Sequence, residues 1–407
     1  MGNRHNVIPP YYWAYMDTGI RLLDADLSSL EESGQSGAGG SAGQRLPQNW
    51  AFFGDSITNV GEGYPFYAQV YSAGRIIPML VESNPGQTSG YLRGVLDEQI
   101  INRNPKPGAC LVLCGANDAQ SNVSLATYRA NVEDIVTRLR SAGIRPVLGT
   151  IPPNNTPAYD ERVRTYNAWL SRWAGTSSIP LVDFYTAVAG GATGWKPGLD
   201  DDGLHPSPAG NAAMGLAVVN DLGDLLSSGK YIVQPRDGAP NLQPNSTFRA
   251  DSNSDGIPDG TWTSNTTTSL IADPAGQFSW ARITVSGQNA TQVLHSDELL
   301  SSSGAFSVGD VMRFSALVRS GQNTTESKTG VQVSVVGYTD AYAVTLNAMI
   351  TSWNGGLSQQ VNGSVVREFT IPPGTTRIMW DLFGGPQDGT YDIALPTLVN
   401  LTSWGML

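Results

Sequence analysis

Five short candidate strands, rich in apolar residues and separated by helical patterns, constrain the fold of this chain more than any other feature. The candidate strands are residues 50–53, 76–81, 109–114, 144–150 and 179–184, and helical periodicity marks residues 125–142, 159–174 and 207–226. An unbroken apolar run is typical of a strand that is buried on both faces. Strands that alternate with helices form a mostly parallel sheet covered on both faces, so we expect an α/β domain over residues 48–234.

Four short polar motifs lie within this region. They are Gly54-Asp55-Ser56, Asn84-Pro85-Gly86-Gln87-Thr88, Gly115-Ala116-Asn117-Asp118 and Asp202-Gly203-Leu204-His205. Ser56 follows the first apolar run, and open α/β sheets place their sites at the ends of such strands. Acyl transfer requires a nucleophile, a base held by a carboxylate, and donors for the developing oxyanion. The set predicts a serine esterase with Ser56 as its nucleophile.

The choice of base is narrow because the chain has only three histidines. His5 lies in a terminal segment, and His295 has no matching motif around it. His205 follows Asp202 by three residues, which allows the carboxylate to reach Nδ1 and leaves Nε2 for the serine. We therefore predict a triad of Ser56, His205 and Asp202.

The oxyanion donors are predicted from the same motifs. Asn117 follows the apolar run 109–114, so its amide is expected near the carboxyl end of a central strand. The backbone N–H of Ser56 and that of a glycine complete the hole. Gly86 is favoured as that glycine, and Gly90 is the alternative.

Residues from about 48 to 226 resemble the SGNH (GDSL) hydrolase family. The resemblance implies a three-layer α/β/α fold and an activity among esterases, acetylesterases, lipases and thioesterases. The spacing around Gly86 departs a little from the family pattern. The family's marker residues correspond to Ser56, Gly86, Asn117 and His205, with Asp202 as the third member of the triad.

Residues 235–407 have a different character. Helical periodicity gives way to alternation of apolar and polar residues, as in 312–319, with Gly, Asn, Ser and Thr between the runs. This pattern predicts an antiparallel β-sandwich that resembles, in general texture, the jelly-roll modules that bind carbohydrate. Its tryptophans either fill the core or stack on sugars; they are Trp262, Trp280, Trp353, Trp380 and Trp404.

An acidic turn opens this region. Oxygen-bearing side chains alternate around Gly256, an arrangement that suits calcium, although Trp262 stands where an EF-hand would have its last glutamate. A solvated Asp/Asn turn explains the pattern equally well. The candidate ligands are Asp251, Asn253, Asp255 and Asp259.

The first 32 residues predict a helical stem. An apolar residue recurs every three or four positions from Trp13 to Leu30, which is the spacing of a coiled-coil seam. The seam either joins copies of the chain, for example as a trimer, or packs on the enzyme itself. Residues 33–47 are rich in Gly and Ser and predict a linker.

Charge and composition limit the classes of binding partner that this chain can have. A net charge of −11 argues against nucleic acid or an anionic membrane as a partner. No apolar run is long enough for a membrane span, and the amino terminus lacks the apolar core that a signal peptide has. Cys110 and Cys114 lie four residues apart on one expected strand, too far to bridge, and are expected to be buried thiols. No cofactor is expected for catalysis.

Together these parts predict an extracellular or virion-borne esterase that removes small acyl groups, foremost acetyl, from a surface polysaccharide or glycolipid. The order of stem, linker, esterase and sandwich resembles that of bacteriophage tail proteins. One alternative is a receptor-binding or structural tail component with incidental esterase activity. Another is a lipase or thioesterase, which the sequence supports less because it has no apolar lid segment.

Overall fold

The structure is a computed structural model that describes residues 45–405 except 59–62, 73, 105, 192, 228–239, 265, 275, 286–291, 321–331, 350–361 and 385–388. The predicted stem, its seam and residues 33–44 of the predicted linker lie outside the described residues. Leu46, near the end of that linker, is buried in the core of the first domain.

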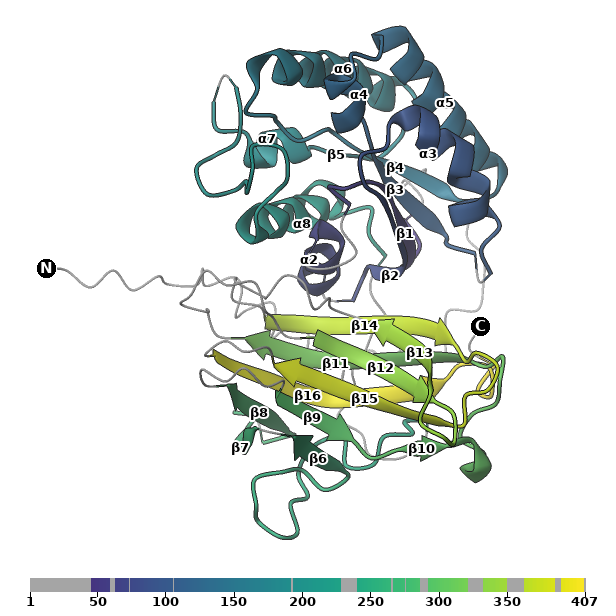
Figure 1. The fold of residues 1–407 in the computed structure, drawn as a ribbon, viewed down its shortest axis with the longest axis vertical. Coiled ribbons are helices and arrows are strands. Elements are labelled where there is room, and N and C mark those ends of the chain that lie inside the picture. The colour runs from purple at the N-terminus through teal and green to yellow at the C-terminus, as the bar shows by residue number, and fades with distance from the viewer. Residues whose placement is uncertain are drawn as a thin grey trace, which may run out of the picture. The chain divides into compact units, whose positions relative to one another are not determined.

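A five-stranded parallel sheet forms the centre of the first domain (Figure 1). Its strands are β1 (Asn49–Asp55), β2 (Ile77–Asn84), β3 (Ala109–Leu113), β4 (Arg145–Gly149) and β5 (Leu181–Val182), in the order β2-β1-β3-β4-β5. All five predicted strands are present, and every residue of β3 is buried, as its unbroken apolar run requires. The strand order reverses direction between β1 and β3, which is where open α/β sheets bind ligands.

Helices cover both faces of this sheet, which gives the expected three-layer α/β/α fold (Figure 1). The three predicted helices correspond to α5, α6 and α8. Helix α2 escaped prediction because seven of its eight residues are buried, which leaves no apolar and polar faces to alternate. The helices are α2 (Tyr64–Tyr71), α3 (Ser89–Leu96) with a π-helical turn η1 (Asp97–Ile101), α4 (Ala116–Gln120), α5 (Leu125–Ser141), α6 (Pro157–Thr176), α7 (Phe184–Val188) and α8 (Pro208–Leu222).

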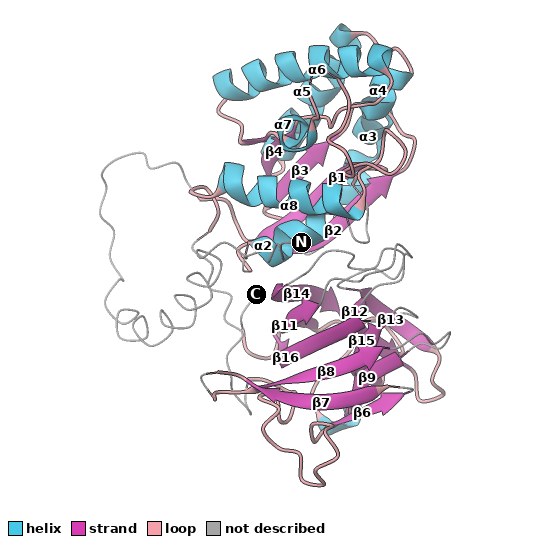
Figure 2. Cartoon of the chain, turned by 90° about the vertical axis from the view of Figure 1, so that its left-hand side faces the viewer, coloured by secondary structure: helices cyan, strands magenta, loops and turns pink. Residues whose placement is uncertain are grey.

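Two antiparallel sheets form the predicted sandwich (Figure 2). One has the order β13-β12-β15-β9-β6, with β10 paired to β15, and the other has the order β14-β11-β16-β8-β7. The alternating run 312–319 lies in β11, whose inward side chains enter the core. The strands are β6 (Thr261–Ser264), β7 (Thr267–Ala272), β8 (Ser279–Val285), β9 (Gln292–Ser296), β10 (Leu299–Leu300), β11 (Val311–Ser320), β12 (Gln332–Tyr338), β13 (Val344–Met349), β14 (Asn362–Thr370), β15 (Arg377–Gly384) and β16 (Gly389–Asn400).

The sandwich core extends onto the α/β domain. Phe66, Tyr67 and Val70 of α2 belong to the same buried cluster as the core of the sandwich. Arg367 of β14 donates a hydrogen bond to the Pro78 carbonyl of β2 at 3.1 Å. The two domains therefore share buried apolar surface within the compact unit that begins at residue 45.

Candidate active site

Ser56 lies directly after β1, at the carboxyl edge of the sheet. Gly54 makes this position possible, because a Cβ there would lie 2.2 Å from the Thr58 Oγ1 and 2.3 Å from the Leu113 carbonyl. Strands β1 and β3 can therefore end in close contact only with glycine at this residue. The sequence motif thus has a packing reason that is separate from chemistry.

The structure brings the three residues of the predicted triad together. The Oγ of Ser56 lies 2.8 Å from Nε2 of His205, across 149 residues of sequence. Nδ1 of the same imidazole lies 2.8 Å from Oδ2 of Asp202. The carboxylate therefore fixes the tautomer that leaves Nε2 as the acceptor of the serine proton.

Asp202 is held in its ionised form. Its partial burial acts to raise its pKa, but the backbone N–H and imidazole of His205 and the backbone N–H of Leu204 donate hydrogen bonds that outweigh this and hold the pKa at about 2. The Oδ1 atom accepts the N–H of Leu204 at 3.0 Å and that of His205 at 2.8 Å. One carboxylate therefore shapes the turn with one oxygen and orients the imidazole with the other.

A second pair of side chains, which the sequence analysis missed, holds this loop. Oδ2 of Asp200 accepts the backbone N–H of Gly203 at 2.8 Å and the side-chain amide of Asn155 at 3.0 Å. The N–H of Asn155 donates to the Gly203 carbonyl at 2.9 Å. Gly203 has a φ of +85°, which favours glycine. The run of three aspartates from Asp200 was the available signal, but the role of Asn155 depends on tertiary contact.

Asn117 is the second residue of the short helix α4, just past the end of β3. It is 9% exposed, and its side-chain amide donates to the Gln87 carbonyl at 3.1 Å. Gly86, the residue before Gln87, is exposed and has a φ of +73°. Gly90 lies inside α3, where a Cβ would contact the Asn131 amide on α5 at 3.5 Å. Asn117 therefore adjoins the loop of Gly86.

Asp118 connects helix α4 to the loop of Gly86 through hydrogen bonds, and the sequence did not predict this contact. It is fully buried, and its two oxygens accept the Oγ of Ser89 at 2.5 Å and the N–H of Ser89 at 2.8 Å. Burial raises the pKa of Asp118, although the hydrogen bonds from Ser89 act in the opposite direction. Ser89 begins α3, directly after the loop of Gly86. The carboxylate beside Asn117 therefore anchors that loop to α4.

Asp55 has an unusual environment next to Ser56. Its Oδ1 accepts the Ile57 N–H at 3.0 Å, while Oδ2 is buried and has no hydrogen-bond partner in the described part of the chain. Burial is the main cause that raises the pKa of this carboxyl to about 7, and the nearby Asp118 adds to the shift. A neutral Asp55 beside Ser56 is therefore the favoured form below that pH.

The acidic turn before β6 uses its oxygens on its own backbone. Asp251 Oδ2 accepts the Gly256 N–H at 3.0 Å, Asp255 Oδ1 accepts the Ile257 N–H at 2.8 Å, and Asp259 Oδ1 accepts the Ser252 N–H at 3.0 Å. The Asn253 amide donates to Asp255 at 2.8 Å. Among the residues that the structure describes, no three His, Cys, Asp or Glu are grouped to hold a metal ion. Calcium binding here stays a prediction.

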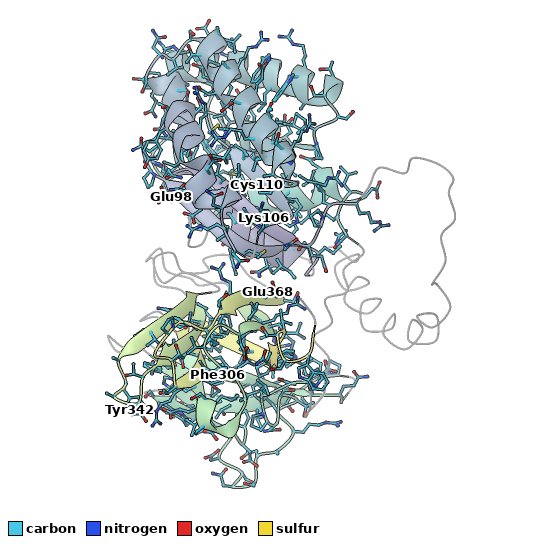
Figure 3. The ribbon with its side chains drawn as sticks, turned by 90° about the vertical axis from the view of Figure 1, so that its right-hand side faces the viewer. Glu98, Lys106, Cys110, Phe306, Tyr342 and Glu368 are labelled. Atoms are coloured by element: carbon cyan, nitrogen blue, oxygen red, sulfur yellow. The ribbon has the colours of Figure 1, made fainter. Side chains whose placement is uncertain are left out.

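The remaining predicted positions are separate from the site. His295 lies in β9 of the sandwich, where its Nδ1 is 2.7 Å from Oδ1 of Asp381. Cys110 and Cys114 are free and buried, as expected, and Figure 3 shows Cys110 inside the α/β domain. His5 lies outside the described residues. Within the described ranges no helix is both long and apolar enough to cross a membrane.

A nucleophile, an imidazole and a carboxylate in hydrogen-bonded series at the edge of a parallel sheet define the class of serine hydrolases. Residues 52–213 match the model of the GDSL-like lipase/acylhydrolase family. This part of the chain therefore resembles the acyl-ester hydrolases of the GDSL-like family. No curated protein matched the sequence.

Three solved structures that are similar to this chain each cover less than half of it. They include a protein of the G-D-S-L family from Desulfitobacterium hafniense (23% identity, TM-score 0.40, 43% of this chain and 99% of that one). A GDSL-like lipase from Bacteroides thetaiotaomicron has 21% identity and a TM-score of 0.38 over 44% of this chain and 90% of its own. An acetylxylan esterase from Geobacillus stearothermophilus has 21% identity and a TM-score of 0.38, over 46% of this chain and 99% of its own.

Proposed function

We propose that this chain is a serine esterase that hydrolyses small acyl esters, foremost acetyl, on a polysaccharide. The single observation that carries this proposal is the hydrogen-bonded series from Ser56 through His205 to Asp202, with 2.8 Å at each step. That geometry is what a nucleophilic serine needs, because a hydroxyl at its ordinary pKa is a weak nucleophile without an adjacent base.

The proposed reaction has two steps. Ser56 Oγ attacks the ester carbonyl while its proton passes to Nε2 of His205, and the imidazolium then returns this proton to the alcohol as the carbon–oxygen bond breaks. Water attacks the acyl-serine with the same base, which releases the carboxylic acid and restores Ser56. Asp202 remains ionised throughout the reaction near neutral pH, because its pKa is about 2.

The oxyanion is proposed to accept hydrogen bonds from the N–H groups of Ser56 and Gly86 and from the Asn117 amide. Asn117 has two amide hydrogens, of which one is donated to Gln87 and the other remains for the substrate oxygen. The bond to Gln87 supports Gly86 over Gly90 as the backbone donor, because it places Asn117 beside the loop of Gly86. Donors fixed before the reaction stabilise the charge that develops in the transition state.

The polysaccharide part of the proposal depends on the sandwich. Its described strands carry exposed tryptophan, and flat amphipathic rings suit contact with sugars. A place on a bacteriophage tail, or another extracellular location, is a further proposal supported only by the order of the parts in the sequence. The test is acetate release from a panel of acetylated bacterial envelope glycans, with Ser56→Ala as the matched control. Release by the wild type alone supports the proposal, and equal release by the two proteins refutes the role of Ser56.

A further inference from the structure

The tryptophans of the sandwich fall into two groups in the structure. Trp280 and Trp380 are 4% and 0% exposed and belong to buried clusters. Trp262 and Trp404 are 43% and 51% exposed, and Trp353 lies outside the described residues. An exposed aromatic ring can serve as a stacking face for a ligand when neighbouring side chains hold it in one orientation. Among the described residues, Trp262 stacks on another ring, that of His295, whereas Trp404 does not.

Trp262 belongs to a row of three side chains that crosses one sheet. Trp262 of β6 pairs with His295 of β9, and His295 pairs with Asp381 of β15. Their neighbours Leu294 and Trp380 point into the sandwich core. Because successive side chains of a strand point to opposite faces, the row lies on the face turned away from that core.

The row fixes the plane of the indole. The rings of Trp262 and His295 are nearly parallel, with centroids 3.8 Å apart and 20° between their planes. His295 is in turn held by Asp381 at 2.7 Å, and this carboxylate is only 2% exposed. Burying a carboxylate is costly, and replacing such a pair by apolar residues often leaves stability unchanged. The presence of this costly pair next to an exposed indole points to a ligand that needs the ring in one orientation.

The charges along the row narrow the class of ligand. Asp259 lies three residues before Trp262, and Asp297 lies two residues after His295, so two acids are close to the stacked rings in sequence. The whole chain carries a net charge of −11. An acidic polymer would be repelled at this edge, whereas the C–H face of a neutral pyranose fits a flat aromatic surface.

We propose that Trp262, held in place by His295 and Asp381, is the stacking platform of a binding site for a neutral polysaccharide. The inference rests on the proposed function, in which this polymer carries the esters. The site is distant in sequence from Ser56 and adds binding without chemistry. It would raise the local concentration of ester groups near the esterase by tethering the polymer.

Binding is tested in the full chain that carries Ser56→Ala, so that the ligand is not hydrolysed. An array of neutral gluco-, xylo-, manno-, galacto- and N-acetylglucosamine oligosaccharides, with uronic acid oligosaccharides for comparison, identifies the probe, and calorimetry on the strongest one gives Kd. We expect Trp262→Ala to raise Kd about tenfold, the factor that corresponds to about 1.4 kcal/mol. Trp262→Phe should raise Kd by a smaller factor, because phenylalanine keeps an aromatic face.

Trp404→Ala is the matched control, because Trp404 is similarly exposed in the same domain and no ring of the described residues stacks on it. Its Kd should stay within about twofold of the parent, since it adds no organised surface. Melting curves check that the Trp262→Ala protein is folded. If it is not, the Kd of Trp262→Phe decides the test instead. An unchanged Kd in the Trp262 variants, equal losses at Trp404, binding confined to uronic acids, or no binding at all would each overturn the inference.

The proposed function is tested separately on the wild type with a soluble acetyl ester. Absence of turnover there rejects the esterase proposal, whatever Trp262 does. Normal turnover together with a Kd unaffected by Trp262→Ala rejects the platform alone.

Discussion

Replacing Asn117 by alanine gives the sharpest view of the oxyanion hole. The side chain is 9% exposed and donates one amide hydrogen to Gln87 at 3.1 Å, which leaves the other for the proposed bond to the substrate oxygen. Loss of one such donor costs about 2.7–4 kcal/mol in the transition state, or about 10² to 10³-fold in kcat. Loss of the bond to Gln87 costs a further ~1 kcal/mol of folding stability.

Steady-state hydrolysis of 4-nitrophenyl acetate by Asn117→Ala separates these effects. We expect kcat to fall with little change in KM, because the donor meets the oxygen only as charge develops. Asn117→Asp is the matched variant, since it keeps the shape but places a second acceptor opposite the Gln87 carbonyl, and it should be at least as impaired. A rise in KM with normal kcat would instead make Asn117 a ground-state binding residue, and this would refute the reasoning.

Three further predictions concern separate parts of the chain. The free energy of unfolding should fall by up to about 4 kcal/mol as pH rises from 4 to 7, because the folded state keeps Asp55 protonated up to about 7 while the unfolded state ionises near 3.8. Asp55→Asn should remove this slope, and equal slopes in denaturant titrations of the two proteins would contradict it. If Asp251, Asn253, Asp255 and Asp259 hold calcium, a chelator should lower the Tm; a constant Tm would mean that the backbone hydrogen bonds of the turn suffice. Removal of residues 1–43 should reduce the mass in light scattering if the seam joins copies, and an unchanged mass would reject self-association.

The sequence predicted the strands of the α/β domain because each is a short segment rich in apolar residues, and it predicted α5 and α6 because each has a polar face. Helix α2 was missed because nearly all of it is buried, much of it against the sandwich. That contact also changes an experiment, because a chain ending near residue 234 would expose Phe66, Tyr67 and Val70. Single substitutions such as Trp262→Ala therefore test the sandwich better than truncation.

In the candidate active site, local sequence motifs were enough to locate the predicted catalytic residues. They did not reveal the side chains that hold the catalytic loops in place. The spacing of Asp202 and His205 predicts their contact, and only Ser56 had to be joined to them by the fold. Asn155 and Asp118 act through partners 45 and 29 residues away, Asp200 and Ser89, so no local pattern reveals them. Likewise the alternation in the sandwich could not separate core from exposed tryptophans, because both faces of its sheets carry large side chains.

The central claim is that Ser56 is the nucleophile, and covalent labelling tests it most directly. A phosphonate that reacts with activated serines is incubated with the wild type, and peptide mapping by mass spectrometry locates the adduct. The mechanism predicts one adduct on Ser56, loss of esterase activity in proportion to labelling, and greatly slowed labelling in His205→Ala, which lacks the base 2.8 Å from the Oγ. Full labelling at another residue, or full activity in a protein labelled at Ser56, would contradict the account.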